Sequence, residues 1–212
     1  MIRSVYAFVK RAFKKRPTAM VCGVGLAIWG GLSFWPKDNL PWYVGVAAPS
    51  HYDMWVINLH LEKSGERSWR IPAGHKGCCW EGGRGPFGTG GSMDPFPNLI
   101  AIHWFSFAEQ KYYSIMIDVP PDLQDQMRVP APNRTQDGEI RHLPRSDLIL
   151  GLAPGGEVVV WMMSQRTNAV EVMRVQAIEV EGNLNAFKER TKNYLERSGA
   201  YLEKHGVPLE GW

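Results

Sequence analysis

Apolar side chains recur at every second position over much of the chain beyond residue 41, which is the period of a β-strand. One predicted strand carries them at four alternate positions, Trp55, Ile57, Leu59 and Leu61. Residues 98–107 (NLIAIHWFSF) are apolar on both faces, which predicts a central strand. Residues 111–119 follow at the spacing of a hairpin. These segments predict antiparallel β-structure.

A second hairpin is predicted nearer the carboxyl terminus. It pairs residues 157–163 (EVVVWMM) with residues 170–180. The apolar phase slips at Val172 and Met173, which indicates a β-bulge there. A further short strand is expected over residues 148–152, just before a turn rich in proline and glycine.

One amphipathic helix is predicted to close the chain, over residues 184–205. Its apolar and small side chains recur at steps of three and four residues: Leu184, Phe187, Thr191, Tyr194, Leu195, Ser198, Tyr201 and Leu202. Asn183 is suited to cap its first turn and Gly206 to end it. The sequence thus predicts a mainly β domain over residues 42–212, an antiparallel β-sandwich or curled sheet with this helix packed against it.

The first 35 residues differ in character from the rest. Residues 1–17 carry a cluster of basic side chains, whereas residues 18–35 (TAMVCGVGLAIWGGLSFW) carry no charge. As a helix, this uncharged segment would be about 27 Å long, close to the ~30 Å hydrocarbon core of a bilayer. Because the basic residues precede it, the positive-inside rule puts them in the cytoplasm and the body outside. We therefore expect a single-pass signal anchor in the bacterial inner membrane, a linker at residues 36–41 and a periplasmic domain.

Two other interpretations of the uncharged segment remain open. A cleaved signal peptide should end in small residues, whereas this stretch ends in Ser33, Phe34 and Trp35 before Pro36. A buried hairpin of a soluble fold would leave the one-sided basic flank unexplained. A lipoprotein signal fits poorly, because its cysteine would stand at the end of the apolar run and Cys22 stands near the start.

Composition and charge narrow the classes of function. The chain has 212 residues, of which 44% are hydrophobic, so it is not a disordered chain, and its 3 Cys exclude a disulfide-stapled mini-protein. The formal net charge is +3, but residues 1–37 hold seven Lys or Arg and no acid. The remaining residues hold 17 basic and 21 acidic side chains, a net charge of −4. An acidic body argues against a nucleic-acid-binding domain.

The adjacent Cys78 and Cys79 are the most unusual local feature. Because Cys22 is expected within the membrane segment, the only partner in the chain for either thiol is its neighbour. Two interpretations stay open: a vicinal disulfide that stiffens the turn before Trp80 or acts as a redox switch, and a pair of free thiols. Metal binding is disfavoured, since adjacent cysteines lack the spacing of a zinc site.

The glycine-rich stretch 82–91 (GGRGPFGTGG) does not match a phosphate-binding loop. Such a loop would need Lys and then Ser or Thr after its last glycine, with a helix behind it. The stretch is predicted to be a surface loop, and Trp80, Arg84, Phe87 and Phe96 lie in it or beside it. Aromatic and arginine side chains are the usual anchors of protein interfaces, so these four residues form the candidate partner-binding site.

No catalytic pattern stands out. The six histidines show no metal-ligand spacing such as HExxH, and no G-x-S-x-G sequence is present. His51 and Asp53 would point to the same side of an extended segment, which permits a weak metal or acid–base site. A solvated or core histidine is the simpler interpretation. We therefore expect no enzyme activity, no catalytic residue, no metal site and no cofactor.

Four segments share a distinctive pattern of aromatic and small residues. They are residues 42–44 with 48–52 (WYV and APSHY), the cysteines at 78–79, residues 102–106 leading to 111–113 (IHWFS and KYY), and residues 151–161 (GLAPGGEVVVW). In this pattern the chain resembles the bacterial envelope family of the domain of unknown function 2931 type, over roughly residues 42–182. Many such proteins look like lipoproteins, whereas here a transmembrane anchor would replace the lipid. The family has no agreed catalytic residues.

The resemblance also implies a role, because some relatives are periplasmic immunity proteins against type VI secretion lipase effectors. By that implication we expect a membrane-tethered, non-enzymatic binding protein that neutralises such a lipase. Its partners would be that protein and the inner membrane, and not a nucleic acid. Two alternatives stay open: an envelope structural or assembly factor that binds another membrane protein, and a small metal-dependent hydrolase built on His51 and Asp53.

Overall fold

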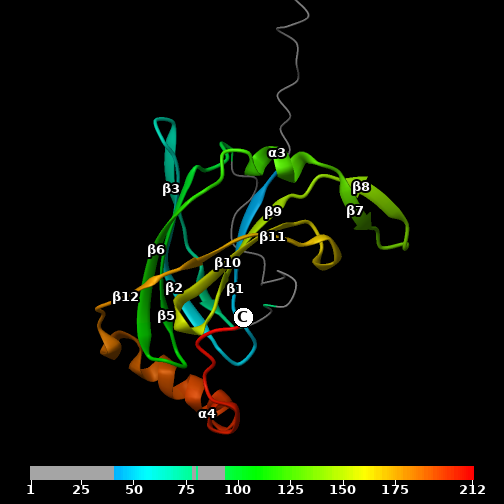
Figure 1. The fold of residues 1–212 in the computed structure, drawn as a ribbon. Coiled ribbons are helices and arrows are strands. Elements are labelled where there is room, and N and C mark those ends of the chain that lie inside the picture. Colours follow the sequence, from blue (N-terminus) through cyan, green and yellow to red (C-terminus); the bar gives the residue numbers. More distant parts are fainter. Residues whose placement is uncertain (1–40, 78–79, 81–93) are drawn as a thin grey trace, which may run out of the picture. The chain divides into compact units, whose positions relative to one another are not determined.

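Most strands lie in two sheets in the computed structural model, which describes residues 41–77, 80 and 94–212 (Figure 1). The smaller sheet has the strand order β1 (Tyr43–Ala47), β9 (Asp147–Leu152), β10 (Glu157–Met163) and β11 (Val170–Gln176). The larger sheet has the order β12 (Ile178–Val180), β6 (Lys111–Asp118), β5 (Leu99–Ser106), β2 (Met54–Lys63) and β3 (Arg67–Ile71), and β4 (Gly74–Lys76) also pairs with β2. A separate hairpin joins β7 (Ala131–Arg134) to β8 (Ile140–Leu143).

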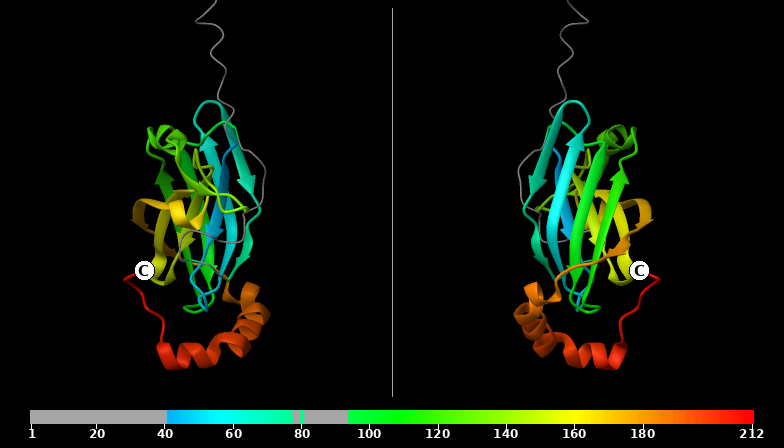
Figure 2. Two further views of the ribbon diagram at one scale, coloured as in Figure 1. Left: turned by 90° about the vertical axis from the view of Figure 1, so that its right-hand side faces the viewer. Right: turned by 90° about the vertical axis from the view of Figure 1, so that its left-hand side faces the viewer.

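One hydrophobic core fills the space between the two sheets, which face each other (Figure 2). From the larger sheet it takes Met54, Leu59, Leu61, Ile100, Ile102 and Trp104, each 1% exposed or less. From the smaller sheet it takes Val44, Val46, Leu148, Leu150, Leu152, Val158 and Val160. Burying one such side chain stabilises a fold by about 1.5–3 kcal/mol. Alternate positions along each strand supply these side chains, which accounts for the two-residue period of the sequence.

The carboxy-terminal helix α4 (Lys188–His205) lies across one end of the sheets (Figures 1 and 2). It continues a 3₁₀ turn, η3 (Leu184–Phe187), and packs against the outer face of the larger sheet. A second apolar cluster joins them: Phe105, Phe107, Tyr112, Phe187 and Tyr194. The predicted caps are confirmed, since Asn183 accepts a hydrogen bond from the Asn185 N–H and Gly206 ends the helix with a φ of 72°.

Three other short helical segments connect the strands. They are α3 (Leu123–Arg128), η1 (Pro154–Gly156) and η2 (Arg166–Asn168). At η1, the Gly155 N–H donates to the Glu109 carboxylate, which also accepts from the Ser106 and Tyr113 hydroxyls at 2.8 and 2.7 Å. Glu109 lies in the turn between β5 and β6, so its carboxylate ties the larger sheet to the β9–β10 turn of the smaller one.

The mainly β architecture with a closing helix is confirmed, but the expectation of wholly antiparallel sheets is wrong at β1. This strand pairs with β9 in parallel, with Tyr43 opposite Asp147 and Ala47 opposite Gly151. After β1 the chain crosses to the larger sheet and later returns through β9 in the same direction. A parallel pair requires a long crossover of this kind. The other strand pairs among the described residues are antiparallel.

The four alternate apolar positions predicted for β2 do not lie on one face of the strand. The register between β2 and β5 shifts at Ile57, which is an extra residue in β2 and so forms a bulge. The bulge reverses the alternation of side chains. Leu59 and Leu61 therefore face the core, whereas Trp55 and Ile57 face outward and Ile57 is 41% exposed.

Residues 170–180 form two strands rather than one, because β11 and β12 lie in different sheets. Ala177 separates the two strands, and its N–H donates to the Gly156 carbonyl at 2.9 Å. The chain thus changes sheets at a single buried residue. The predicted bulge is confirmed, since the register between β10 and β11 skips Val172.

Several elements were not expected from the sequence. They are β3, β4, α3, β7 and β8. The predicted apolar stripe of the closing helix is also narrower than expected. Leu184 and Leu195 are 51% and 40% exposed, while Phe187, Thr191 and Tyr194 are buried.

The predicted cytoplasmic segment (residues 1–17), the membrane anchor (residues 18–35) and nearly all of the linker (residues 36–41) lie outside the described residues. Residues 40–212 form one compact unit. Within the part of the chain that the structure describes, no helix combines the length and apolar character needed to cross a bilayer.

Candidate functional site

Two hollows in the surface flank the turn between β1 and β2. This turn begins at Pro49, whose carbonyl accepts a hydrogen bond from the Tyr52 N–H at 3.1 Å. His51, its third residue, has a φ of 73°, in the left-handed region that side chains rarely adopt. The turn is therefore held in a conformation that local sequence alone does not favour, and contacts from elsewhere have to stabilise it.

Those contacts come from α4. The His51 ring stacks on Tyr201 with ring centroids 3.8 Å apart, and Tyr201 in turn stacks on His205 at 4.4 Å. The Tyr194 hydroxyl donates to the His51 carbonyl at 2.7 Å. Burial, and then the nearby Asp53 carboxylate, raise the pKa of Tyr194 above its ordinary value, so the phenol stays protonated and remains a donor. The helix thus fixes the turn at two points.

Asp53, at the end of the turn, carries a buried carboxylate that is 3% exposed. Its Oδ2 atom lies 2.8 Å from Nε2 of His75 in β4 and also accepts a hydrogen bond from Nη2 of Arg197 in α4. A buried carboxylate is costly by several kcal/mol unless it is paired and hydrogen-bonded. The pairing therefore ties the turn, β4 and α4 together.

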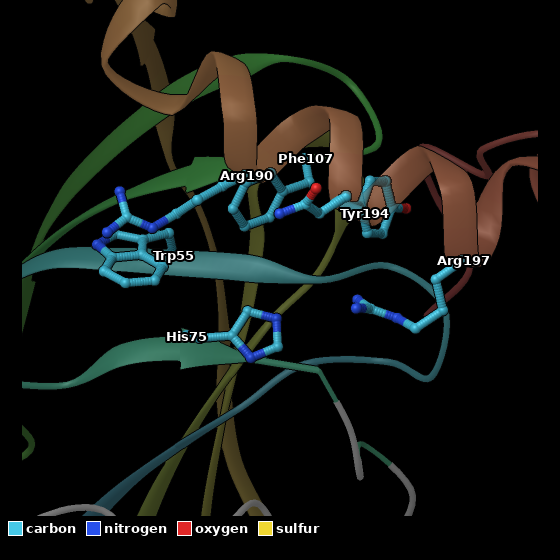
Figure 3. Close-up of a pocket in the computed structure, with 7 residues that line it drawn as sticks. Trp55, His75, Phe107, Arg190, Tyr194 and Arg197 are labelled. Carbon is cyan, nitrogen blue, oxygen red and sulfur yellow. The ribbon is translucent and has the colours of Figure 1, made fainter.

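The first hollow, which we term the basic hollow, lies between α4 and the outer face of the larger sheet and has a volume of about 260 Å³. Figure 3 shows the side chains that line it, among them Trp55, His75, Phe107, Arg190, Tyr194 and Arg197. The Arg190 guanidinium stacks over the Trp55 ring at 4.2 Å from its centroid. Two arginines of one helix thus border a hollow whose walls are partly aromatic.

The second hollow, which we term the aromatic hollow, has a volume of about 680 Å³. Its lining includes five ring-bearing side chains: His51, Tyr52, Trp80, Tyr201 and Trp212. The Trp212 ring meets both the Tyr52 and Trp80 rings edge to face, with centroids 5.2 and 6.0 Å apart. The Tyr52 hydroxyl donates to the Gly206 carbonyl at 3.1 Å, which holds the segment after α4 against the turn.

Trp80 is anchored in the aromatic hollow by the smaller sheet. Its ring packs edge to face on Trp161 of β10, with centroids 5.0 Å apart. Gly151 of β9 leaves room for this pair, because a Cβ atom at that position would overlap ring atoms of both tryptophans. The glycine is required here for close approach and not for an unusual backbone angle.

The structure describes two of the four candidate partner-binding residues, Trp80 and Phe96, and these two lie in different surroundings. Trp80 lies in the aromatic hollow. Phe96 is only 6% exposed and packs edge to face on Trp42 at 4.9 Å, so it belongs to the core and not to an exposed loop. Arg84 and Phe87 lie outside the described residues.

The two cysteines of the proposed vicinal disulfide, Cys78 and Cys79, also lie outside the described residues, and both interpretations of them stay open.

The suggested metal or acid–base site of His51 and Asp53 is not formed. The left-handed backbone of His51 turns its ring onto Tyr201, whereas Asp53 faces His75 and Arg197. Among the residues that the structure describes, no three His, Cys, Asp or Glu side chains cluster closely enough to hold a metal ion.

Sequence analysis missed three side chains of the basic hollow: His75, Arg190 and Arg197. Arg190 and Arg197 lie seven residues apart on α4, with Tyr194 between them, and this spacing puts all three on one helix face. That signal was present in the sequence, although the other charges of the helix obscured it. No local signal marked His75, since it meets Asp53 only through the pairing of β4 with β2.

Comparison with family models identifies the family of this chain. The model of the family described as "Protein of unknown function (DUF2931)" matches residues 33–210. No curated protein and no solved structure matches the chain. The match includes the turn, the basic hollow and α4, and it includes the lining of the aromatic hollow except for Gly211 and Trp212.

We predict that Gly151→Ala destabilises the protein by about 1–3 kcal/mol, because the added methyl group forces the Trp80 and Trp161 rings apart. The measurement is the free energy of unfolding in urea, followed by tryptophan fluorescence. Gly199→Ala is the matched control, since a Cβ at this position in α4 meets nothing within 4 Å. The control should stabilise the protein by roughly 0.5–1 kcal/mol. Equal stability of Gly151→Ala and the wild type would contradict the packing described here.

Proposed function

We propose that this chain, which belongs to the DUF2931 family, is a membrane-tethered periplasmic binding protein that neutralises a type VI secretion lipase effector. It acts by binding a protein, and it performs no chemistry of its own. The observation that carries the binding role is the aromatic hollow, where Trp80, Trp212 and the stacked His51 and Tyr201 rings line one concavity.

The chemistry of the aromatic hollow suits a protein partner. Tryptophan and tyrosine supply large apolar areas with few rotatable bonds, and they are enriched among the residues that dominate binding energy at protein interfaces. Trp80 and Trp212 are half-buried, so part of each ring remains available for contact. A volume of about 680 Å³ accommodates one or more side chains of a partner.

The proposed cellular location follows from the amino-terminal sequence. Basic residues precede the uncharged residues 18–35, and this order favours a body on the outer side of the inner membrane. A tether would keep the protein beside the phospholipids that a periplasmic lipase attacks. The lipase itself is implied by the family resemblance, and the aromatic hollow supports the more general role of binding a protein.

The proposed location predicts which reporters are active when fused after Trp212. Alkaline phosphatase, which is active only outside the cytoplasm, should be active there, and a cytoplasmic reporter at the same position should be silent. The measurement is phosphatase activity in intact cells, normalised to the amount of fusion protein. A silent phosphatase at normal expression would contradict the proposed topology.

The binding role predicts that Trp212→Ala and Trp80→Ala each weaken partner binding by on the order of thirtyfold or more, as expected for anchor residues that contribute about 2 kcal/mol. The assay captures the full-length tagged chain from detergent-solubilised envelopes and measures by mass spectrometry the amount of phospholipase in the captured material. Survival of cells challenged by a type VI-competent attacker gives the matching readout in vivo.

Met116→Ala is the matched control for this experiment. Met116 is 68% exposed on β6 and does not line the aromatic hollow, so its loss should change neither capture nor survival. Captured material that contains no phospholipase protein, or capture that both tryptophan variants retain in full, would contradict the proposal. Normal envelope assembly in cells that lack the gene would separate this role from that of an assembly factor.

A further inference from the structure

We infer that the basic hollow is a binding site for a phosphate ester, with the phosphate group held between Arg190 and Arg197. This ligand site is separate from the aromatic hollow and does not depend on the proposed lipase partner. Figure 3 shows the arrangement: Arg190 with Trp55 lies on one side, Arg197 on the other, and Phe107 and Tyr194 lie between them.

Arg190 is a cation without a counterion in the described part of the chain. Its guanidinium stacks on Trp55 at 4.2 Å and lies 6.0 Å from the Phe187 ring centroid, and it forms no ion pair with any described carboxylate. Stacking on an aromatic face orients the guanidinium plane and leaves its N–H groups pointing outward from the edge of that plane. Arg190 is thus preoriented to donate hydrogen bonds to an anion.

On the other side of the hollow, Arg197 is held by the Asp53 carboxylate. The single negative charge of this carboxylate does not balance the positive charges of the two arginines. The Asp53 carboxylate serves both Arg197 and His75 through the same oxygen. The two arginines and Asp53 together carry a net charge of +1. Asp53, which is 3% exposed, positions the Arg197 side chain by accepting its hydrogen bond. A further negative charge would complete the balance.

The spacing of the two arginines favours a phosphate group. Seven residues along a helix correspond to about 10 Å, and arginine side chains are long enough to reach different oxygens of one group from the two ends of this interval. Guanidinium forks match phosphate oxygens in pairs of parallel hydrogen bonds, and a phosphate group has enough oxygens for two forks. A carboxylate has only two oxygens and suits a single fork.

The remaining walls indicate an organic substituent on the phosphate. Trp55 and Phe107 present aromatic surface, and the volume of about 260 Å³ exceeds what a phosphate ion needs. The shared chemistry is therefore a phosphate ester, which can come from a soluble phosphomonoester or from a phospholipid headgroup.

Binding to the full-length chain in an uncharged detergent at low ionic strength tests this inference. Isothermal titration calorimetry would use two probes, glycerol 3-phosphate and dihexanoyl phosphatidylglycerol below its micelle concentration. Saturable binding of either probe, displaced by inorganic phosphate, is the expected result, and the probe that binds more tightly identifies the source. Absence of saturable binding for both probes would overturn the inference.

Arg190→Gln should weaken the binding by on the order of tenfold, because it removes a charged hydrogen-bond donor. This variant leaves the pairing of Asp53 intact, so its loss of binding reports on the hollow and not on the fold. Arg190→Lys keeps the charge but loses the fork, and it should bind with intermediate affinity.

Lys192→Gln removes the same charge from α4 at an exposed position outside the hollow, and it should bind within about twofold of the wild type. Equal losses in Lys192→Gln and Arg190→Gln would show nonspecific attraction and overturn the inference. Trp212→Ala should retain phosphate binding, so failure of the protein-partner proposal and failure of this one are distinguishable.

Discussion

The buried carboxylate of Asp53 constrains the part of the domain that contains the β1–β2 turn, α4 and both hollows. Asp53 is 3% exposed, and a carboxylate in that position is tolerated only with cationic or hydrogen-bonding partners. Its partners come from β4 and from the far end of the chain, through His75 and Arg197. These pairings, together with the apolar cluster around Phe187 and Tyr194, hold α4 in its position on the larger sheet. Both hollows are consequences of that position.

The structure explains the roles of several residues in the segments that suggested the family resemblance. The turn before β2 supplies His51 and Tyr52 to the aromatic hollow, and Gly151 makes room for the edge-to-face rings of Trp80 and Trp161. The glycines that follow β9 form a turn that the Glu109 carboxylate ties to the larger sheet. Each of these residues thus has a structural reason for its place.

The sequence predicted those features that depend on local patterns. Apolar patterns predicted β2, β5, β6, β9, β10 and the segment of β11 and β12. The cap at Asn183 and the end at Gly206 depend only on the backbone at the helix ends. Features that depend on distant contacts were missed. Val56 and Ile57 are both apolar, so nothing in the pattern marked the bulge that reverses β2, and Phe96 looked exposed because its contact with Trp42 spans 54 positions of the chain.

The central claim is that Asp53 holds α4 in place, and hydrogen exchange measured by mass spectrometry tests it most directly. Asp53→Asn keeps the size of the side chain and removes its charge. The account predicts faster exchange along α4 and in the turn that contains His51, with unchanged protection in the central strands β5 and β9. Protection of α4 equal to that of the wild type would contradict it.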